Sequence, residues 1–368
     1  MNGNGIAQGG EEKLISELRA LYRSHGYIRY KMSKFEAYDL YASNKDFLTS
    51  QDIITFPEAG GKLMALKPDV TLSIVRNSAE QADCVRKVYY NESVYRRPKG
   101  SKSFREITQV GLECMGDVDD YCVCEVLYLA AKSLLAISRD CVLAVSHLGI
   151  VSELLDRLGM SAEERAKAFS CISGKNLHEL SCLLEAAEDR EAAKALGRLV
   201  TLSGAPEEVL EELTALGCRG AYVDELKRLT EMLSELLPKG VLTLDFSVAN
   251  DARYYTGVVF KGFVSGVPAG VLAGGRYDPL MKKMGKKSGA IGFAVYLDAL
   301  ERLLNTEKQY DVDTLLLYDA EAKPADVFRA VETLSQDGAT VLAERAAPEN
   351  LIYRRLLRLK DGEVLGDA

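Results

Sequence analysis

The chain has 368 residues, a formal net charge of -8 and a charged fraction of 27%. This length allows two or three domains with a large core, and the composition is ordinary for a soluble globular protein. The acidity disfavours a large RNA-binding surface, no apolar run is long enough for a membrane span, and we expect no signal peptide. Eight cysteines and three histidines are scattered along the chain, and the one close cysteine pair, Cys122 and Cys124, lies in a helical pattern typical of buried thiols. We therefore expect a reduced, cytoplasmic protein that holds no metal ion and no cofactor.

The N-terminal part of the sequence predicts a helix followed by short strands. Residues 11–25 carry apolar side chains at helical spacing, and Gly26 ends this stripe. Residues 52–75 predict two short strands around a glycine turn. Asp69 follows a proline just after the second strand, which is a pattern typical of the N-terminal cap of a helix.

The stretch 88–116 predicts two strands joined by a cationic loop, residues 96–105, that contains Pro98 and other turn formers. Period-two alternation places Gln109 and Glu113 on one face of the second strand. The cationic loop suits a polyphosphate, and the Gln and Glu suit a small polar ligand that carries hydrogen-bond donors. A solvated hairpin with a charged tip is the alternative interpretation.

The rest of the chain predicts a helix over 117–138, a strand over 142–148 and a helical insertion over 149–238. Strands resume at Gly240. The last segment, 306–368, predicts the start of a βαβ unit and, at its Asp-Gly dipeptide, a hairpin.

This hairpin-rich pattern, without regular βαβ alternation in the body, predicts an α+β fold. We expect a mixed, mainly antiparallel sheet built from residues 50–115 and 240–300 and flanked by helices. The expected organisation is a body over 1–305, which includes the insertion at 149–238, and a truncated C-terminal α/β segment over 306–368.

The stretch 95–113 resembles motif 2 of the class II aminoacyl-tRNA synthetases, specifically of histidyl-tRNA synthetase. The family pattern has a strand that ends in Phe-Arg, then a loop, then Arg-x-Phe-x-Gln-x-Gly-x-Glu. The resemblance extends over most of residues 10–305. It includes the dimer-forming motif 1 at 26–41, where Ser33 replaces a proline, and the family's Gly-Gly-Arg-Tyr-Asp turn at 274–278.

The resemblance implies a histidine pocket made by five positions: Asp69, Thr71, Gln109, Glu113 and Tyr255. The first three would hold the amino group of the amino acid, and the last two would hold its imidazole. Arg96 and Arg105 would contact a phosphate or another anion. Asp69 and Thr71 can both accept hydrogen bonds from an ammonium group. The alternative interpretation, in which Asp69 caps the N-terminus of a helix, fits the sequence equally well.

Two cations of the family pattern are missing. Motif 3 should read Gly-Phe-Ala-x-Gly-x-Glu-Arg-Leu, and the arginine that clamps ATP falls on Ala299. The arginine of the histidine-specific signature falls on Asn250, whereas the Tyr-Tyr-Thr-Gly at 254–257 matches. Amino-acid activation joins two anions, and losing one preorganised donor costs roughly a hundredfold to a thousandfold in rate. These departures argue against a working synthetase.

A synthetase-like body with an amino-acid pocket and without these cations resembles a paralogous family, the regulatory subunits of short-form ATP phosphoribosyltransferase. That resemblance implies a non-catalytic chain in a hetero-octamer with the short catalytic subunit, a homodimer through residues 10–45 and the central hairpin, and histidine as inhibitory ligand in the first step of L-histidine biosynthesis. It implies no tRNA and no membrane partner. The alternatives are a degenerate histidyl-tRNA synthetase-like protein that activates histidine, and a synthetase-like module that binds RNA or a translation regulator.

Overall fold

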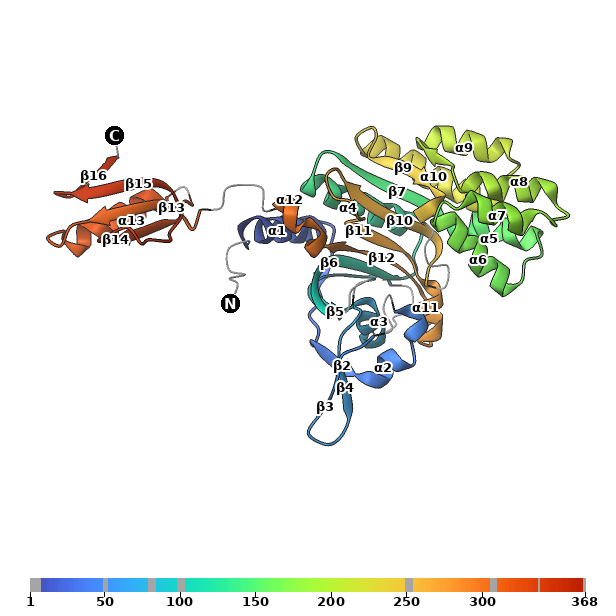
Figure 1. Ribbon diagram of the computed structural model, residues 1–368, viewed down its shortest axis with the longest axis horizontal. Helices are drawn as coiled ribbons and strands as arrows, with labels where there is room; N and C mark the ends of the chain where they lie inside the picture. The colour runs from blue at the N-terminus through green and yellow to red at the C-terminus, as the bar shows by residue number, and fades with distance from the viewer. Residues whose placement is uncertain are drawn as a thin grey trace. The chain divides into compact units, whose positions relative to one another are not determined.

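The computed structural model describes residues 8–48, 52–78, 84–97, 103–248, 254–304, 310–336 and 338–366. The chain divides into two compact units, drawn in Figure 1. The large unit is Lys13–Leu300, and the small unit combines Met1–Glu12 with Glu301–Ala368. Among the described residues, none of the helices combines the length and the apolar character that crossing a bilayer requires.

A nine-stranded sheet runs through the large unit in the order β1-β5-β6-β12-β11-β10-β7-β9-β8. Its strands are β1 (Ile28–Arg29), β5 (Arg86–Arg96), β6 (Arg105–Gly116), β7 (Cys141–His147), β8 (Ser203–Gly204), β9 (Leu242–Asp245), β10 (Thr256–Val264), β11 (Leu272–Arg276) and β12 (Gly289–Tyr296). Only the pairs β1–β5 and β7–β9 are parallel among these described strands. This arrangement confirms the expected α+β fold with a mixed, mainly antiparallel sheet.

Helices cover both faces of this sheet. On one face lie α1 (Gln8–Ser24) and α4 (Asp120–Ile137), where the Tyr22 hydroxyl meets the Ser133 hydroxyl at 2.9 Å and the Tyr22 ring packs edge-on against Phe293. On the other face, buried residues of α3 (Thr71–Asn77) and α11 (Asp278–Lys283) share one core cluster with Tyr90 of β5. The face that carries Glu113 is therefore enclosed by α3 and α11.

The region expected to be helical contains six helices, which form one lobe of the large unit (Figure 1). They are α5 (Leu148–Arg157), α6 (Ala162–Ser173), α7 (Leu177–Leu184), α8 (Arg190–Leu199), α9 (Pro206–Ala215) and α10 (Ala221–Leu236). The short strand β8 interrupts them and adds the last strand to the main sheet. Short helical turns follow at η2 (Phe246–Val248), η3 (Leu297–Leu300) and α12 (Glu301–Leu304).

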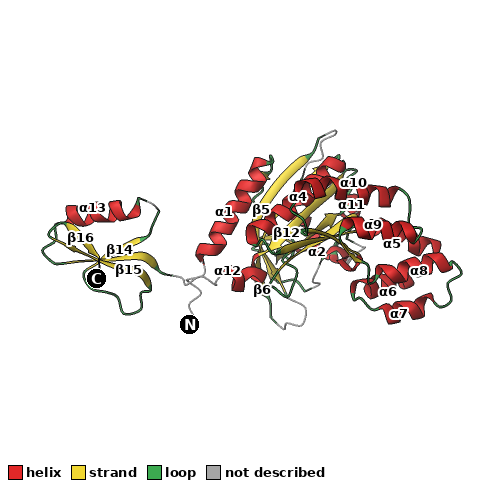
Figure 2. Cartoon of the chain, turned by 90° about the horizontal axis from the view of Figure 1, so that it is seen from above, coloured by secondary structure: helices red, strands yellow, loops and turns green. Residues whose placement is uncertain are grey.

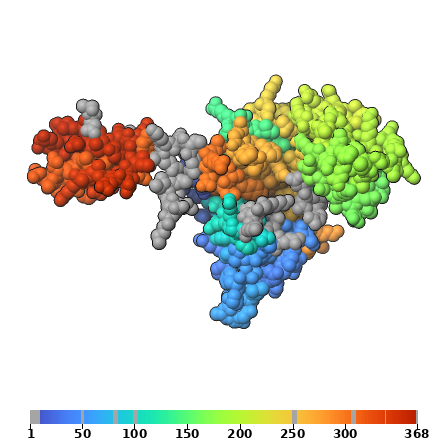
Figure 3. Space-filling view, in the orientation of Figure 1, coloured from blue at the N-terminus to red at the C-terminus, as the bar shows by residue number. Residues whose placement is uncertain are grey.

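One part of the expected sheet was wrong. Residues 55–66 do not join the main sheet but form a separate antiparallel sheet of β2 (Phe35–Ala37), β4 (Leu63–Leu66) and β3 (Thr55–Pro57), next to η1 (Lys45–Phe47) and α2 (Tyr38–Ala42). Figure 3 shows this sheet (blue) standing out from the large unit. The reason is that β2 pairs with β4, and the rings of Phe35 and Phe56 pack edge-on across this sheet. Strand pairing thus depends on contacts that the alternation within one strand does not specify.

The C-terminal part of the small unit is a four-stranded sheet in the order β14-β13-β15-β16. The strands β13 (Val312–Tyr318) and β14 (Val341–Glu344) are parallel and joined by α13 (Pro324–Ser335), which confirms the expected βαβ start. Figure 2 shows α13 along one face of this sheet. The strands β15 (Tyr353–Lys360) and β16 (Glu363–Gly366) form a hairpin. Asp361 (φ 51°) and Gly362 (φ 84°) both adopt the left-handed conformation that such a turn requires.

Candidate functional site

Strand pairing places Gln109 and Glu113 on one buried face at the centre of the sheet. Glu113 lies between Val88 of β5 and Gly292 of β12, and Gln109 lies opposite Tyr296 of β12. Their exposed fractions are only 3% for Gln109 and 2% for Glu113. A Cβ atom on Gly292 would lie 1.8 Å from Oε2 of Glu113, so a glycine is required there to admit the carboxyl group.

The carboxyl group of Glu113 accepts two hydrogen bonds from distant parts of the chain. The Thr71 hydroxyl, at the start of α3, donates to Oε1 at 2.8 Å, and the Tyr277 hydroxyl, just before α11, donates to Oε2 at 2.7 Å. Burial raises the pKa of Glu113 to about 8, because these two hydrogen bonds offset only part of the desolvation and the charge of Asp69 adds to it. Near neutral pH the group is therefore mostly protonated. We call Glu113, Gln109, Thr71 and Tyr277 the Glu113 site.

Asp69 caps the N-terminus of α3, which confirms the helix-cap interpretation of the sequence. Its Oδ1 accepts a hydrogen bond from the backbone N–H of Leu72 at 2.9 Å, in the first turn of α3. Its Oδ2 lies 3.8 Å from a guanidinium nitrogen of Arg96. Burial raises the pKa of Asp69, and the nearby Arg96 opposes that shift. The carboxylate thus fixes the start of α3, the helix that carries Thr71.

Arg96 and Arg105 form the last residue pair of the β5–β6 hairpin. Arg96 donates from Nε to the backbone carbonyl of Pro68 at 2.6 Å, so it holds the segment that leads into α3. Both arginines also act on Asp298, whose pKa burial raises and their charges lower. Arg105 is exposed. Of the other basic residues of the loop, Arg97 pairs with Asp52 at 2.6 Å, and Lys99 and Lys102 lie outside the described residues.

Tyr255 packs against two core clusters, one that includes Tyr277, the hydrogen-bond partner of Glu113, and one where the insertion begins. Its ring lies 4.6 Å from that of Tyr254 in an edge-on contact, and it packs against Leu148 and Val259 where the insertion begins. The structure thus brings Thr71 and Glu113 into direct contact, although the resemblance assigns them to opposite ends of the ligand. It places Gln109 on the same face. Asn250, the position of the missing signature arginine, lies outside the described residues.

Two tyrosines, Tyr277 and Tyr296, were not assigned to this region from the sequence. Tyr277 hydrogen bonds Glu113, and the signal for it was the stretch 274–278, which reads more simply as a tight turn. Tyr296 stands where motif 3 has its second glycine. It ends β12 opposite Gln109, and its pKa, raised by burial, responds to the charges of Arg96 and Asp69. A phenol ring therefore occupies the end of the site at which the family pattern has no side chain.

These contacts define what the Glu113 site can do. A buried carboxyl group accepts hydrogen bonds from two hydroxyl groups, and the Gln109 amide belongs to the same face of β6. Among these described residues no nucleophile is activated by a base, so the site suits binding of a small polar ligand better than covalent chemistry. No group of three or more His, Cys, Asp or Glu side chains placed to hold a metal ion occurs among the described residues.

The family model of histidyl-tRNA synthetase matches residues 8–300 of the chain. The chain belongs to the histidyl-tRNA synthetase family. The match covers the whole large unit, including the Glu113 site and the insertion, and ends just before α12.

Curated relatives in this family carry two different names. An ATP phosphoribosyltransferase regulatory subunit from Oceanobacillus iheyensis is 26% identical over 307 residues, which cover 80% of this chain and 74% of that protein. A histidine–tRNA ligase from Methanocaldococcus jannaschii is 28% identical over 292 residues, which cover 77% of this chain and 70% of that protein. Sequence similarity by itself therefore leaves both functions under consideration.

Solved structures agree with the fold of the chain. A protein from Bacillus halodurans described as an ATP phosphoribosyltransferase regulatory subunit/histidyl-tRNA synthetase superposes with a TM-score of 0.77 at 22% identity, covering 98% of this chain and 95% of that one. A chain of the ATP phosphoribosyl transferase (HisG:HisZ) complex from Thermotoga maritima gives a TM-score of 0.62 at 17% identity, covering 77% and 96%. Because both identities are below 25%, these similarities show a shared fold and not a shared function.

Proposed function

We propose that this chain is the non-catalytic regulatory subunit of a short-form ATP phosphoribosyltransferase. In this role it activates a separate catalytic subunit, which joins ATP to phosphoribosyl pyrophosphate in the first step of L-histidine biosynthesis. It also conveys feedback inhibition by histidine. The observation that carries the proposal is the match to a relative of that name over 80% of the chain. Ala299 and Tyr296, at the positions of the motif 3 arginine and glycine, support it.

The partner in this proposal is the short catalytic subunit, in a hetero-octamer with four copies of each chain. A chain of the same fold belongs to the Thermotoga maritima complex, which supports a partnership with a catalytic subunit. We further propose that the chain dimerises through residues 10–45 and the central hairpin, and that the complex acts in the cytoplasm. Light scattering of the purified chain at micromolar concentration tests the dimer, and a monomer there would contradict it.

The ligand in this proposal is histidine, bound at the Glu113 site. Asp69, Thr71 and Gln109 hold its amino group, while Glu113 and Tyr255 hold its imidazole. The hydrogen bond between Thr71 and Glu113 rearranges when the ligand enters, because it joins groups that face opposite ends of histidine. Inhibition follows if histidine prefers a less active arrangement of the complex, and a coupling of about 1–3 kcal/mol changes activity several-fold to about a hundredfold.

The test is to reconstitute the complex with Glu113→Ala and to titrate histidine. Loss of the Glu113 side chain leaves the imidazole without its hydrogen-bond partner, which costs about 1–3 kcal/mol, so the inhibition curve moves to histidine concentrations about five- to a hundredfold higher. Activation of the catalytic subunit stays, because assembly uses other surfaces. The exposed Glu235→Ala is the matched control.

Two outcomes contradict the proposal at different levels. An unchanged inhibition curve for Glu113→Ala places the inhibitory site elsewhere. A catalytic subunit whose activity does not respond to the wild-type chain at all removes the regulatory role itself.

A histidine-activating synthetase is the second candidate, favoured by the match to the Methanocaldococcus jannaschii ligase. We expect no histidine-dependent pyrophosphate exchange, because Ala299 and Asn250 replace the cations that this chemistry needs. Robust exchange that Glu113→Ala abolishes would establish the synthetase function instead.

A further inference from the structure

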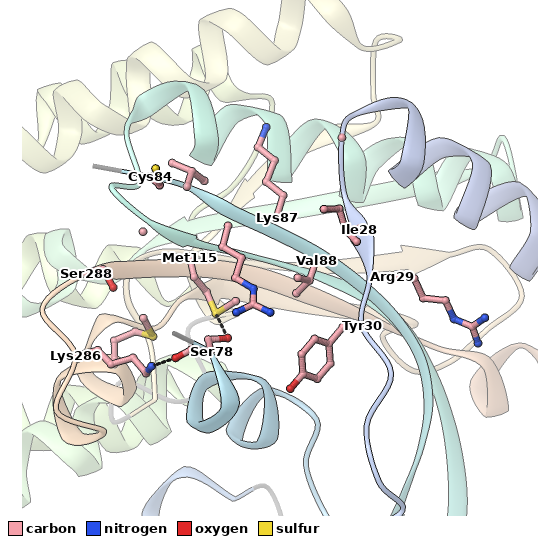
Figure 4. Close-up of a pocket in the computed structure, with 15 residues that line it drawn as sticks. Ile28, Arg29, Tyr30, Ser78, Cys84, Lys87, Val88, Met115, Lys286 and Ser288 are labelled. Carbon is pink, nitrogen blue, oxygen red and sulfur yellow. Dashed lines mark hydrogen bonds between the residues drawn. The ribbon is translucent and has the colours of Figure 1, made fainter. Parts of the chain in front are cut away.

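A cavity of about 420 Å³ lies on the same face of β5 and β6 as Glu113, two residue pairs further along the ladder, at Arg86 and Met115. It is lined from β1, the end of α3, the start of β5 and the loop before β12. Figure 4 shows the side chains of Tyr30, Ser78 and Lys286 on one side of these strands and that of Lys87 on the other. The cavity thus has its own lining, distinct from the Glu113 site.

The lining is cationic although the chain is acidic. Four of its residues carry a positive charge: Arg29, Arg86, Lys87 and Lys286. No Asp or Glu occurs among the described residues of the lining. Lys87 turns away and pairs with Glu125 at 2.6 Å, so its charge is largely neutralised on the other side of the sheet. Of the other three cations, Arg29 is exposed on the edge strand β1, whereas Arg86 and Lys286 line the cavity from β5 and from the loop before β12.

These two cations have unused hydrogen-bonding capacity. Lys286 donates to the backbone carbonyl of Ser78, which uses one of its three ammonium protons. Arg86 lies with its guanidinium 6.0 Å from the centre of the Tyr30 ring. No ion pair with a carboxylate of the described residues involves Arg86, which leaves its donors available to an anion.

The backbone around Arg86 is held in place. Gly116 has φ 133°, and a Cβ atom on it would lie 2.2 Å from the carbonyl oxygen of Cys84. The end of β6 therefore packs directly on the start of β5, and the ladder pairs Arg86 with Met115. A fixed strand position lowers the cost of ordering the guanidinium when an anion binds.

We propose that this cavity binds an organic phosphate, with the phosphate group on Arg86 and Lys286 and the carbon skeleton against Tyr30 and Met281. A planar guanidinium and an ammonium group match the geometry and the double charge of a phosphate monoester. The volume lies in the range of sites for small ligands and exceeds what one phosphate group fills.

This inference rests on the proposed function for the identity of the ligand. In that function, phosphoribosyl pyrophosphate is a substrate of the catalytic subunit, and it is an organic phosphate. Ile28 beside the cavity is 73% exposed on the edge strand β1, in the segment proposed to form the dimer. Because the cavity adjoins this segment, binding is tested on the full chain, in which the dimer can form.

The experiment is isothermal titration calorimetry of the isolated full-length chain with ribose 5-phosphate, phosphoribosyl pyrophosphate, ribose and citrate. We expect both phosphate esters to bind with a Kd below about 1 mM and ribose to give no signal. Arg86→Ala weakens binding at least tenfold, roughly the effect of losing a charge-assisted hydrogen bond. Arg86→Lys, which keeps the charge without the fork, falls between. The exposed Arg139→Ala, a matched loss of charge, leaves the Kd unchanged.

Three results overturn the inference: no heat of binding at millimolar phosphate ester, citrate binding as tightly as ribose 5-phosphate, or equal weakening by Arg139→Ala. The first denies the site, and the other two reduce it to general attraction of anions. Because the catalytic subunit is absent, these results are separable from the proposed function. Phosphate binding without activation of a catalytic subunit contradicts only the regulatory role, and activation without phosphate binding contradicts only this inference.

Discussion

The two ends of the β5–β6 hairpin differ in chemistry although they share one ladder. At the Glu113 end, a buried carboxyl group accepts hydrogen bonds from Thr71 and Tyr277. At the loop end, Arg96 is used by the backbone carbonyl of Pro68, and Arg105 is exposed. The end that the family resemblance assigns to the amino acid is thus an assembled polar site, whereas at the end that it assigns to phosphate one arginine makes a structural contact and the other is exposed.

This difference shows how one end of a hairpin can keep paired polar side chains while the other end changes. The Glu113 end is supported by residues of α3, β6 and the turn before α11, so its polar atoms satisfy one another even without a ligand. The loop end changes through two positions close together in sequence, Tyr296 and Ala299. A phenol replaces an open position and a methyl group replaces a cation.

The largest expected effect concerns the pH dependence of stability that the buried carboxyl group of Glu113 causes. Its pKa in the folded chain is about 8, above its ordinary value of 4.5, so the folded state holds this proton more tightly than the unfolded state. Stability therefore falls as the pH rises from about 4.5 to 8, by up to roughly 5 kcal/mol from this group. Glu113→Gln should remove that fall. Urea unfolding at pH 5 and at pH 8 measures it.

The exposed Glu235→Gln serves as the control for this titration, and it should keep the wild-type dependence on pH. Equal slopes for wild type and Glu113→Gln would mean that Glu113 is ionised in the folded chain. The contrast between the two ends of the hairpin would then be one of position and not of charge.

A smaller effect separates the two arginines. Arg96→Ala removes the hydrogen bond to Pro68 and leaves the buried Asp69 carboxylate without its nearby cation. Together these losses should cost about 1–3 kcal/mol of stability. Arg105→Ala should stay within about 0.5 kcal/mol, as is usual at exposed positions. Thermal unfolding of both variants in one buffer gives the comparison. Similar losses for the two would show that Arg96 has no special structural role.

The smallest expected effect tests Tyr296, which stands where the family pattern has a glycine. Tyr296→Gly should improve ATP binding by about tenfold, near the lower limit of a typical steric cost, because the cation missing at Ala299 is not restored. Tyr296→Phe keeps the ring and should give no gain. Equilibrium dialysis with labelled ATP measures both. A gain with Tyr296→Phe would assign the effect to the hydroxyl group and not to the ring.

Local patterns determined much of the fold. Helical spacing predicted α1, turn chemistry predicted the Asp361-Gly362 hairpin, and period-two alternation put Gln109 and Glu113 on one face. The proline-aspartate pattern likewise predicted the cap of α3. Each of these features depends on residues a few positions apart, whose geometry the backbone imposes directly.

Only the tertiary structure decided the partners of these features. The strands over 55–66 pair with β2 and leave the main sheet, since strand alternation does not specify a partner. Tyr277 reaches Glu113 from 164 residues away in sequence. Burial, which is a property of the whole fold, sets the pKa of Glu113 and turns a polar residue on a strand into a proton-holding group.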